Sequence, residues 1–196
     1  ISRREDSDIA RGWNILMHSF GVISWLLVLF APEIVLILGG NKYGDAIYLI
    51  APMVTGTLFR FYSYSYTAVQ NYYKKTGAVA ASTVSVMILN VILNYVCILH
   101  FGYQAAAYTT AFSYLVLLCI QAAMEKKLTK KQLIPLRQTL RISCGYFVLC
   151  IITMLLYSRH FLLRWAIALC LVPLGFKYFT PHLKSILHML KNKQKK

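Results

Sequence analysis

Acidic side chains are scarce in this sequence, which has six Asp and Glu residues against 21 Lys and Arg residues. Three of the six lie in the N-terminal stretch "REDSD", and Glu125 lies beside a basic segment. Only Glu33 and Asp45 remain, which is too few for a convincing pair of acid and base catalysts. We therefore expect this chain not to be an enzyme.

The usual motifs for metals and nucleotides are also missing. The five cysteines all fall inside apolar runs, without a Cys-x-x-Cys or Cys/His pair at metal-binding spacing, and the five histidines are scattered. The sequence has no glycine-rich phosphate-binding loop. We expect neither a bound metal nor a cofactor.

The chain begins "ISRRED", without methionine and without the pattern of a signal peptide. We expect it to be a C-terminal piece of a longer protein. Another part of the longer protein could then complete a binding site that this chain forms only in part.

Charge is low overall and hydrophobicity is high. The chain is 58% hydrophobic and 14% charged, with a mean hydropathy of +0.56, whereas soluble domains are about half apolar and about a quarter charged. The basic residues sit in short clusters between apolar runs, which is typical of membrane topology rather than of a nucleic-acid surface. We expect a membrane protein that does not bind nucleic acid.

The apolar runs are long enough to cross a bilayer as helices, which takes about 20 residues. No run alternates as a barrel strand would, so the expected fold class is all-α, a polytopic transmembrane helix bundle. Pro32 is expected to kink or end the first span. Six spans are predicted, at residues 13–38, 46–72, 78–99, 103–124, 140–157 and 161–179.

Lys and Arg alternate between the two sides of these predicted spans. About 17 of the 21 fall in the N-terminal segment, the second and fourth loops and the tail. By the positive-inside rule this places both ends of the chain in the cytoplasm. The predicted organisation is a cytoplasmic lead-in (1–12), a four-helix core (13–124), a basic loop (125–139), two further spans (140–179) and a basic tail (180–196).

Arg60 interrupts the second predicted span near its middle. A charged side chain costs at least about 2.5–3.5 kcal/mol at that depth, so it should face a protein-lined, polar cavity or a structural partner. Helical spacing puts further polar residues on its face. The candidate substrate-binding stripe consists of Arg60, Ser63, Tyr64, Thr67 and Asn71.

Arginine can hold a phosphate or carboxylate through two hydrogen bonds, and tyrosine can stack on a sugar ring. The stripe therefore suits an anionic, sugar-bearing substrate. Tyr62 and Tyr66 lie away from it, and Tyr72 and Tyr73 fit an aromatic belt beside two lysines.

Asn90 and Asn94 lie one helical turn apart in the third predicted span. Asparagine within a membrane usually hydrogen-bonds a neighbouring helix, and contact with substrate is the alternative that keeps both residues among the candidate site residues. Gln121 and Glu125 are open to the same two interpretations, with Glu125 expected at the membrane interface.

Three segments together resemble a known family. They are "ISRREDSD", "LFAPEIVLILGGNKYGDAIYLIAPM" and "YYKKTGAVAASTVSVMILNVILNYVCILHFGYQAAAYTTAFSY". Their order and spacing are similar to the multidrug/oligosaccharidyl-lipid/polysaccharide exporter superfamily, and to its O-antigen and capsule repeat-unit flippases in particular. The similarity covers about residues 1–114. Gln104 and Ala105 depart from the family pattern.

The resemblance implies a bacterial inner-membrane protein of 12–14 helices in two lobes, of which this chain is most of the C-terminal lobe. Its partners would be the missing N-terminal lobe, membrane lipids and an undecaprenyl-diphosphate-linked oligosaccharide, moved across the membrane by alternating access. Arg60 matches the expected cationic role by position and chemistry.

Two other functions remain open at this point. A cation-coupled drug exporter of the same superfamily would favour an acidic residue at mid-span. A membrane-embedded glycan polymerase or ligase would need catalytic residues in large outer loops, whereas the outer loops expected here are only a few residues long.

The topology can be tested by cysteine labelling. With Lys74→Cys and Asp45→Cys introduced separately, a membrane-impermeant maleimide should label the first from the cytoplasmic side and the second from the opposite side. Labelling of both positions from one side would contradict the six-span topology.

Overall fold

The computed structural model describes residues 3–129, 134–157 and 165–166. Every regular element among them is helical, which confirms the predicted all-α class. The elements are α1 (Arg3–Leu29), α2 (Ala31–Gly39), the short 3₁₀ segment η1 (Asn41–Ala46), α3 (Ile47–Tyr72), α4 (Thr76–Phe101), α5 (Ala105–Thr129) and α6 (Leu136–Leu155).

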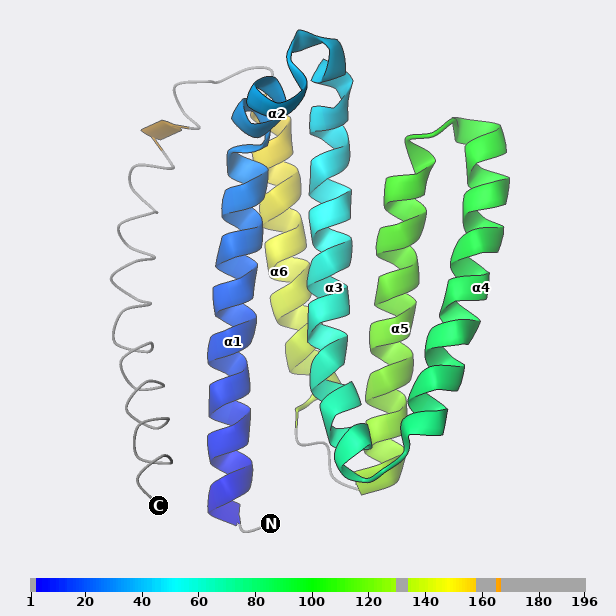
Figure 1. The fold of residues 1–196 in the computed structure, drawn as a ribbon. Coiled ribbons are helices and arrows are strands. Elements are labelled where there is room, and N and C mark those ends of the chain that lie inside the picture. The colour runs from blue at the N-terminus through cyan, green and yellow to red at the C-terminus, as the bar shows by residue number, and fades with distance from the viewer. Residues whose placement is uncertain (1–2, 130–133, 158–164, 167–196) are drawn as a thin grey trace.

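Helix α3 lies in the middle of the bundle (Figure 1). Helices α1 and α6 pack on one side of it, and α5 packs most extensively on the other, with α4 outside α5. Only 6% of α4 is buried, and large apolar side chains such as Val91, Tyr95 and Leu99 are exposed along it. An outer helix with such a surface suits contact with lipid.

Four described helices are long and apolar enough to cross a membrane, namely α1 from Gly12 to Leu29, α4, α5 and α6. They indicate a multi-pass membrane protein. Helix α3 corresponds to the predicted second span, but its arginine and hydroxyl groups lower its mean hydropathy and it is not among the four. The predicted span 161–179 lies outside the described residues, apart from 165–166.

The predicted span 13–38 is not one helix. Helix α1 ends at Leu29 and α2 starts at Ala31, with Pro32 in its first turn. Proline has no backbone N–H, so in a continuous helix the carbonyl of Val28 would lose its usual donor. The hydroxyl of Tyr157, just after α6, donates to that carbonyl instead. The expectation that Pro32 kinks or ends the first span is thus confirmed, because α1 ends at Leu29 and α2 begins at Ala31.

The helix ends do not coincide with the predicted segment boundaries, which refer to the membrane and stay predictions. Helix α1 already begins at Arg3, inside the expected lead-in of residues 1–12. Helix α5 continues to Thr129 and α6 starts at Leu136, so much of the segment predicted as loop 125–139 is helical.

The start of α1, the turn between α3 and α4, the end of α5 and the start of α6 all lie at one end of the bundle (Figure 1). Lys74, Lys75, Lys126 and Lys127 are exposed there. We call this the basic end. The lysines after α3 and near the end of α5, which the charge count assigned to one side, therefore lie at the same end of the described bundle, and the placement of that end in the cytoplasm remains a prediction.

Small residues allow α3 and α5 to approach closely. A methyl group added at Gly56 would lie 3.1 Å from the Cα atom of Ala111. Small residues at such crossings are typical of packed membrane helices, because they bring two backbones into van der Waals contact. Gly56 therefore fixes the height at which α3 and α5 cross.

A larger side chain at this crossing should force the two helices apart. We expect Gly56→Leu to lower the free energy of unfolding by about 1–3 kcal/mol, the usual cost of overpacking. Thermal unfolding of the detergent-solubilised full-length protein would measure it. Gly77→Leu is the control, because the Cβ position of Gly77 is open. Equal effects of the two substitutions would contradict the crossing described here.

Candidate functional site

The predicted stripe runs along the half of α3 that leads to the basic end. Asn71 lies eleven residues after Arg60, or about 16 Å along the helix. Arg60 and Thr67 are half-buried, Tyr64 and Asn71 are exposed, and Ser63 is buried. The structure therefore keeps four of the five residues at least partly accessible and turns Ser63 into the protein.

Two aromatic rings hold the guanidinium of Arg60. Its central carbon lies 4.9 Å from the ring centroid of Tyr64 and 6.0 Å from that of Tyr114 on α5. Contacts of this kind stabilise a cation electrostatically but leave its N–H groups available to donate hydrogen bonds. No described carboxylate forms an ion pair with Arg60, so an anion could be bound here.

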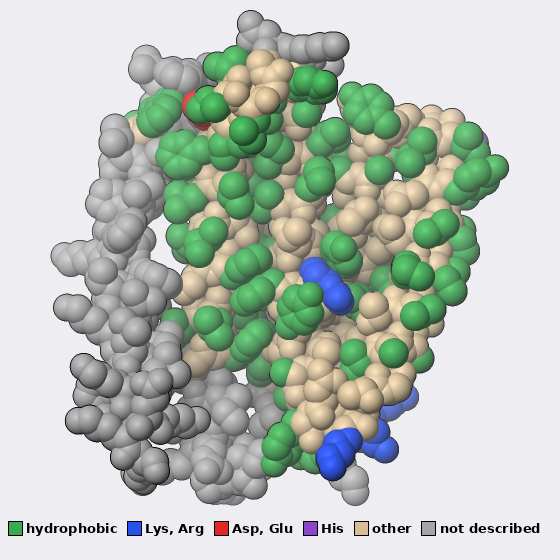
Figure 2. Space-filling model, viewed as in Figure 1, with side chains coloured by type: hydrophobic (Ala, Val, Ile, Leu, Met, Phe, Trp, Pro, Cys, Tyr) green, Lys and Arg blue, Asp and Glu red, His purple; other side chains and the backbone are tan. Residues whose placement is uncertain are grey.

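The face of the molecule over α3 and α5 is mostly hydrophobic, with a few basic groups. Figure 2 shows hydrophobic groups over the height of the described helices, with basic side-chain atoms halfway up the face over α3 and α5 and again at the bottom. A positive charge at mid-height within an apolar face is costly in lipid, as the position of Arg60 in the sequence indicated.

The hydroxyls of the stripe are partly used inside α3. Ser63 donates to the carbonyl of Arg60 at 2.7 Å, and Thr67 donates to the carbonyl of Ser63 at 3.1 Å. The half-buried Thr67 oxygen can still accept a hydrogen bond, for example from a sugar hydroxyl, whereas the Ser63 oxygen is buried. Tyr64 and Asn71 offer an exposed phenol and an exposed amide.

Asn90 and Asn94 join α4 to α5. The Asn90 amide donates to the Ser113 hydroxyl at 3.1 Å, the Asn94 amide donates to Asn90 Oδ1 at 3.1 Å, and Thr109 donates to Asn94. The interhelical hydrogen bonds expected of these residues are confirmed, and their contact with substrate stays a prediction. Ser113 precedes Tyr114, so this network and Arg60 lie at similar heights on different sides of α5.

Gln121 is fully buried and links three helices. Its Oε1 accepts from Gln70 Nε2 at 2.7 Å, and its Nε2 donates to the Ser82 hydroxyl at 2.9 Å. Glu125, one turn further along α5, is also fully buried. Its side chain lies within the protein near the basic end, and its position at the membrane interface stays a prediction.

Tyr62 and Tyr66 face the interior, as their spacing predicted, and both are at most 1% exposed. The Tyr62 hydroxyl donates to the carbonyl of Met17 on α1 at 2.9 Å, and the Tyr66 hydroxyl lies 2.9 Å from that of Thr139 on α6. The tyrosines of α3 thus divide into a structural pair and the exposed Tyr64.

Tyr114 is the site residue that the sequence did not reveal. It directly follows Ser113, which belongs with Thr109 to a polar i, i+4 series of α5, so Tyr114 itself lies off that polar face. Only the packing of α5 against α3 brings its ring to Arg60, more than 50 residues earlier in the chain.

Comparison of the chain with protein-family models, with curated proteins and with solved structures finds no match. The functional argument therefore depends on the residues and their geometry.

The interhelical role of Asn90 can be measured with a double-mutant cycle. We expect Asn90→Ala and Ser113→Ala to show a coupling free energy of about 0.6 kcal/mol, the average for hydrogen bonds within membranes. Thermodynamic stability of the full-length protein in detergent micelles would be measured for each variant. The exposed Asn71→Ala should change stability by less than about 0.5 kcal/mol. A coupling of zero would show that the Asn90–Ser113 bond does not stabilise the bundle.

Proposed function

We propose that this chain is part of a membrane exporter that moves an undecaprenyl-diphosphate-linked oligosaccharide across the bacterial inner membrane. In this proposal the full protein has two lobes that rock around a central cavity and belongs to the multidrug/oligosaccharidyl-lipid/polysaccharide exporter superfamily. The product would be used for O-antigen or capsule synthesis.

The observation that carries the proposal is the state of Arg60. Its guanidinium lies in the middle of α3, between two tyrosine rings, without an ion pair to any described carboxylate. A diphosphate supplies the missing negative charge and matches the fork of guanidinium donors. The aromatic and amide groups nearby suit the sugars attached to it.

In the mechanism that we propose, Arg60 binds the diphosphate while the α3–α5 face borders the cavity. Tyr64, Thr67 and Asn71 then provide a path of hydrogen-bonding groups toward the basic end, whereas the buried Ser63 does not reach it. The other lobe closes the opposite wall of the cavity. Alternating access exposes the same site first to one side of the membrane and then to the other.

Glu125 is the observation that favours a second function, a cation-coupled drug exporter. A carboxylate buried in a helical bundle could bind a proton or an organic cation. Glu125, however, lies near the basic end of α5 and not at mid-height. At mid-height, the positive charge of Arg60 would repel a cationic substrate. The polysaccharide exporter therefore accounts for more of the site.

Removal of the Arg60 charge should stop export. For a charged group that binds a diphosphate, the loss of about 1.5–3 kcal/mol corresponds to a fall of roughly ten- to 150-fold. We expect Arg60→Ala to show this fall and Arg60→Lys to keep part of the activity, because lysine retains the charge but not the fork. Surface polysaccharide in a strain that depends on the full-length protein would be measured.

The control is Lys74→Ala, which removes an exposed positive charge at the end of the same helix. It should export normally at equal protein level. Normal export by a stable, membrane-inserted Arg60→Ala variant would overturn the proposal. Export of a cationic drug that depends on Glu125 but not on Arg60 would favour the second function.

A further inference from the structure

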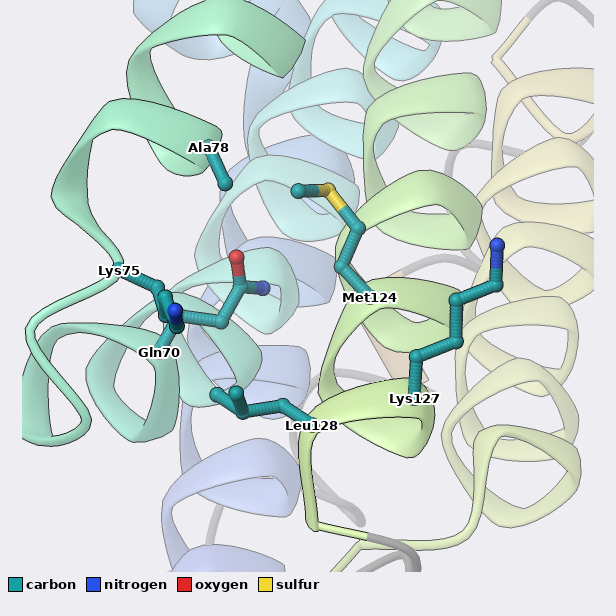
Figure 3. A pocket seen from close by; sticks show the side chains of 6 residues that line it. All are labelled: Gln70, Lys75, Ala78, Met124, Lys127 and Leu128. Carbon is teal, nitrogen blue, oxygen red and sulfur yellow. The ribbon is translucent and has the colours of Figure 1, made fainter.

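A pocket lies at the basic end, where the turn after α3 meets the last turns of α5 (Figure 3). Its volume is about 250 Å³, and it is lined by Gln70, Lys75, Ala78, Met124, Lys127 and Leu128. This volume is below the range of about 300–1,000 Å³ that is usual for whole small-molecule ligands. The pocket is separate from the Arg60 stripe and suits a small polar head with a short apolar segment.

Gln70 contributes an acceptor that the bundle leaves unused. The side chain is 1% exposed, and its Nε2 donates to both the backbone carbonyl (3.1 Å) and the Oε1 (2.7 Å) of Gln121. A backbone carbonyl only accepts, so the amide orientation is fixed. Among the described residues Gln70 Oε1 has no hydrogen-bond partner.

Figure 3 shows the direction of this oxygen. The carboxamide of Gln70 reaches between the two helices with its oxygen directed toward Ala78 and Met124. A buried acceptor without a donor is destabilising, so a ligand hydroxyl that donates to it would be favoured.

The two charged residues that line the pocket are both lysines. Lys75 and Lys127 line it and are exposed, as are Lys74 and Lys126 beside them. The Lys127 ammonium lies beyond Met124 in Figure 3, and its flexible stem allows it to reach the rim. Lysines at a membrane surface attract anionic headgroups.

The surroundings place the pocket at the level of lipid headgroups. Tyr72 and Tyr73 are 70% and 45% exposed next to the lysines, an arrangement typical of the membrane–water interface. Ala78, Met124 and Leu128 give the pocket apolar walls. A free phosphate would leave these walls uncovered, whereas the glycerol backbone and first acyl carbons of a lipid would cover them.

We infer that this pocket binds an anionic phospholipid whose headgroup carries a hydroxyl, such as phosphatidylglycerol. The phosphate lies between Lys75 and Lys127, and a headgroup hydroxyl donates to Gln70 Oε1. The first part of an acyl chain covers Met124 and Leu128. This site requires a membrane protein but does not depend on the transport proposed above.

The test compares two charge-matched double variants of the full-length protein. Lys75→Gln/Lys127→Gln removes the two lysines of the pocket, and Lys74→Gln/Lys126→Gln removes their exposed neighbours. Binding of phosphatidylglycerol is measured by native mass spectrometry in detergent, with phosphatidylcholine as the zwitterionic reference. We expect roughly tenfold weaker phosphatidylglycerol binding for the pocket variant and a change of under about threefold for the control.

Two further variants distinguish binding in the pocket from general electrostatic attraction of anionic lipid to the lysines. Ala78→Phe should fill the pocket and weaken phosphatidylglycerol binding with all lysines present. Gln70→Leu should reduce the preference for phosphatidylglycerol over phosphatidic acid, which has no headgroup hydroxyl, and thermal unfolding would identify a variant that fails to fold.

Three results would overturn the inference. They are equal losses for the two lysine pairs, unchanged binding by a folded Ala78→Phe variant, and binding of free glycerol phosphate as tight as that of the lipid. These experiments measure lipid binding and not export. The lipid-site inference and the proposed export function can therefore be overturned independently.

Discussion

Polar side chains on α3 are paired with groups on the surrounding helices, and the arrangement of the bundle depends on this pairing. Tyr62 reaches α1, Tyr66 reaches α6 and Gln70 reaches α5. In lipid, water is not available to satisfy such groups, so each needs a partner in the protein. Helix α3, the long described helix that is not among the four apolar enough to cross a membrane, therefore lies in the middle, and those four surround it.

Both proposals begin from polar groups of α3 that lie outside this pairing. The Arg60 guanidinium lies at mid-height without a described carboxylate, and Gln70 Oε1 lies near the basic end without a described donor. The guanidinium can bind an anion, and Gln70 Oε1 can accept a hydrogen bond from a hydroxyl. A diphosphate-linked glycan and a hydroxyl-bearing anionic lipid satisfy these needs at different depths of the same bundle.

The packing of α5 against α3 also determines which side chains lie beside Arg60 and Gln70. The close approach at Gly56 holds α5 against α3, and this brings Tyr114 to Arg60 and Gln121 to Gln70. Helix α4 packs mainly on α5 and is held through its asparagines. A change in the crossing of α3 and α5 would therefore alter both sites at once.

The sequence by itself determined the helical class, the membrane environment and the grouping of basic residues, because a long apolar run has one stable backbone form in lipid. Helical spacing also separated Tyr64 from the inward-facing Tyr62, since 3.6 residues per turn fix relative directions along one helix. The expected kink or end of the first span at Pro32 is found as the division between α1 and α2. Only the tertiary structure decided which polar groups are satisfied within the protein, because their partners are distant in sequence. In the folded bundle Gln70 hydrogen-bonds Gln121, and Tyr114 lies beside Arg60. Both are contacts between different helices, and the residue pattern along one helix does not contain them.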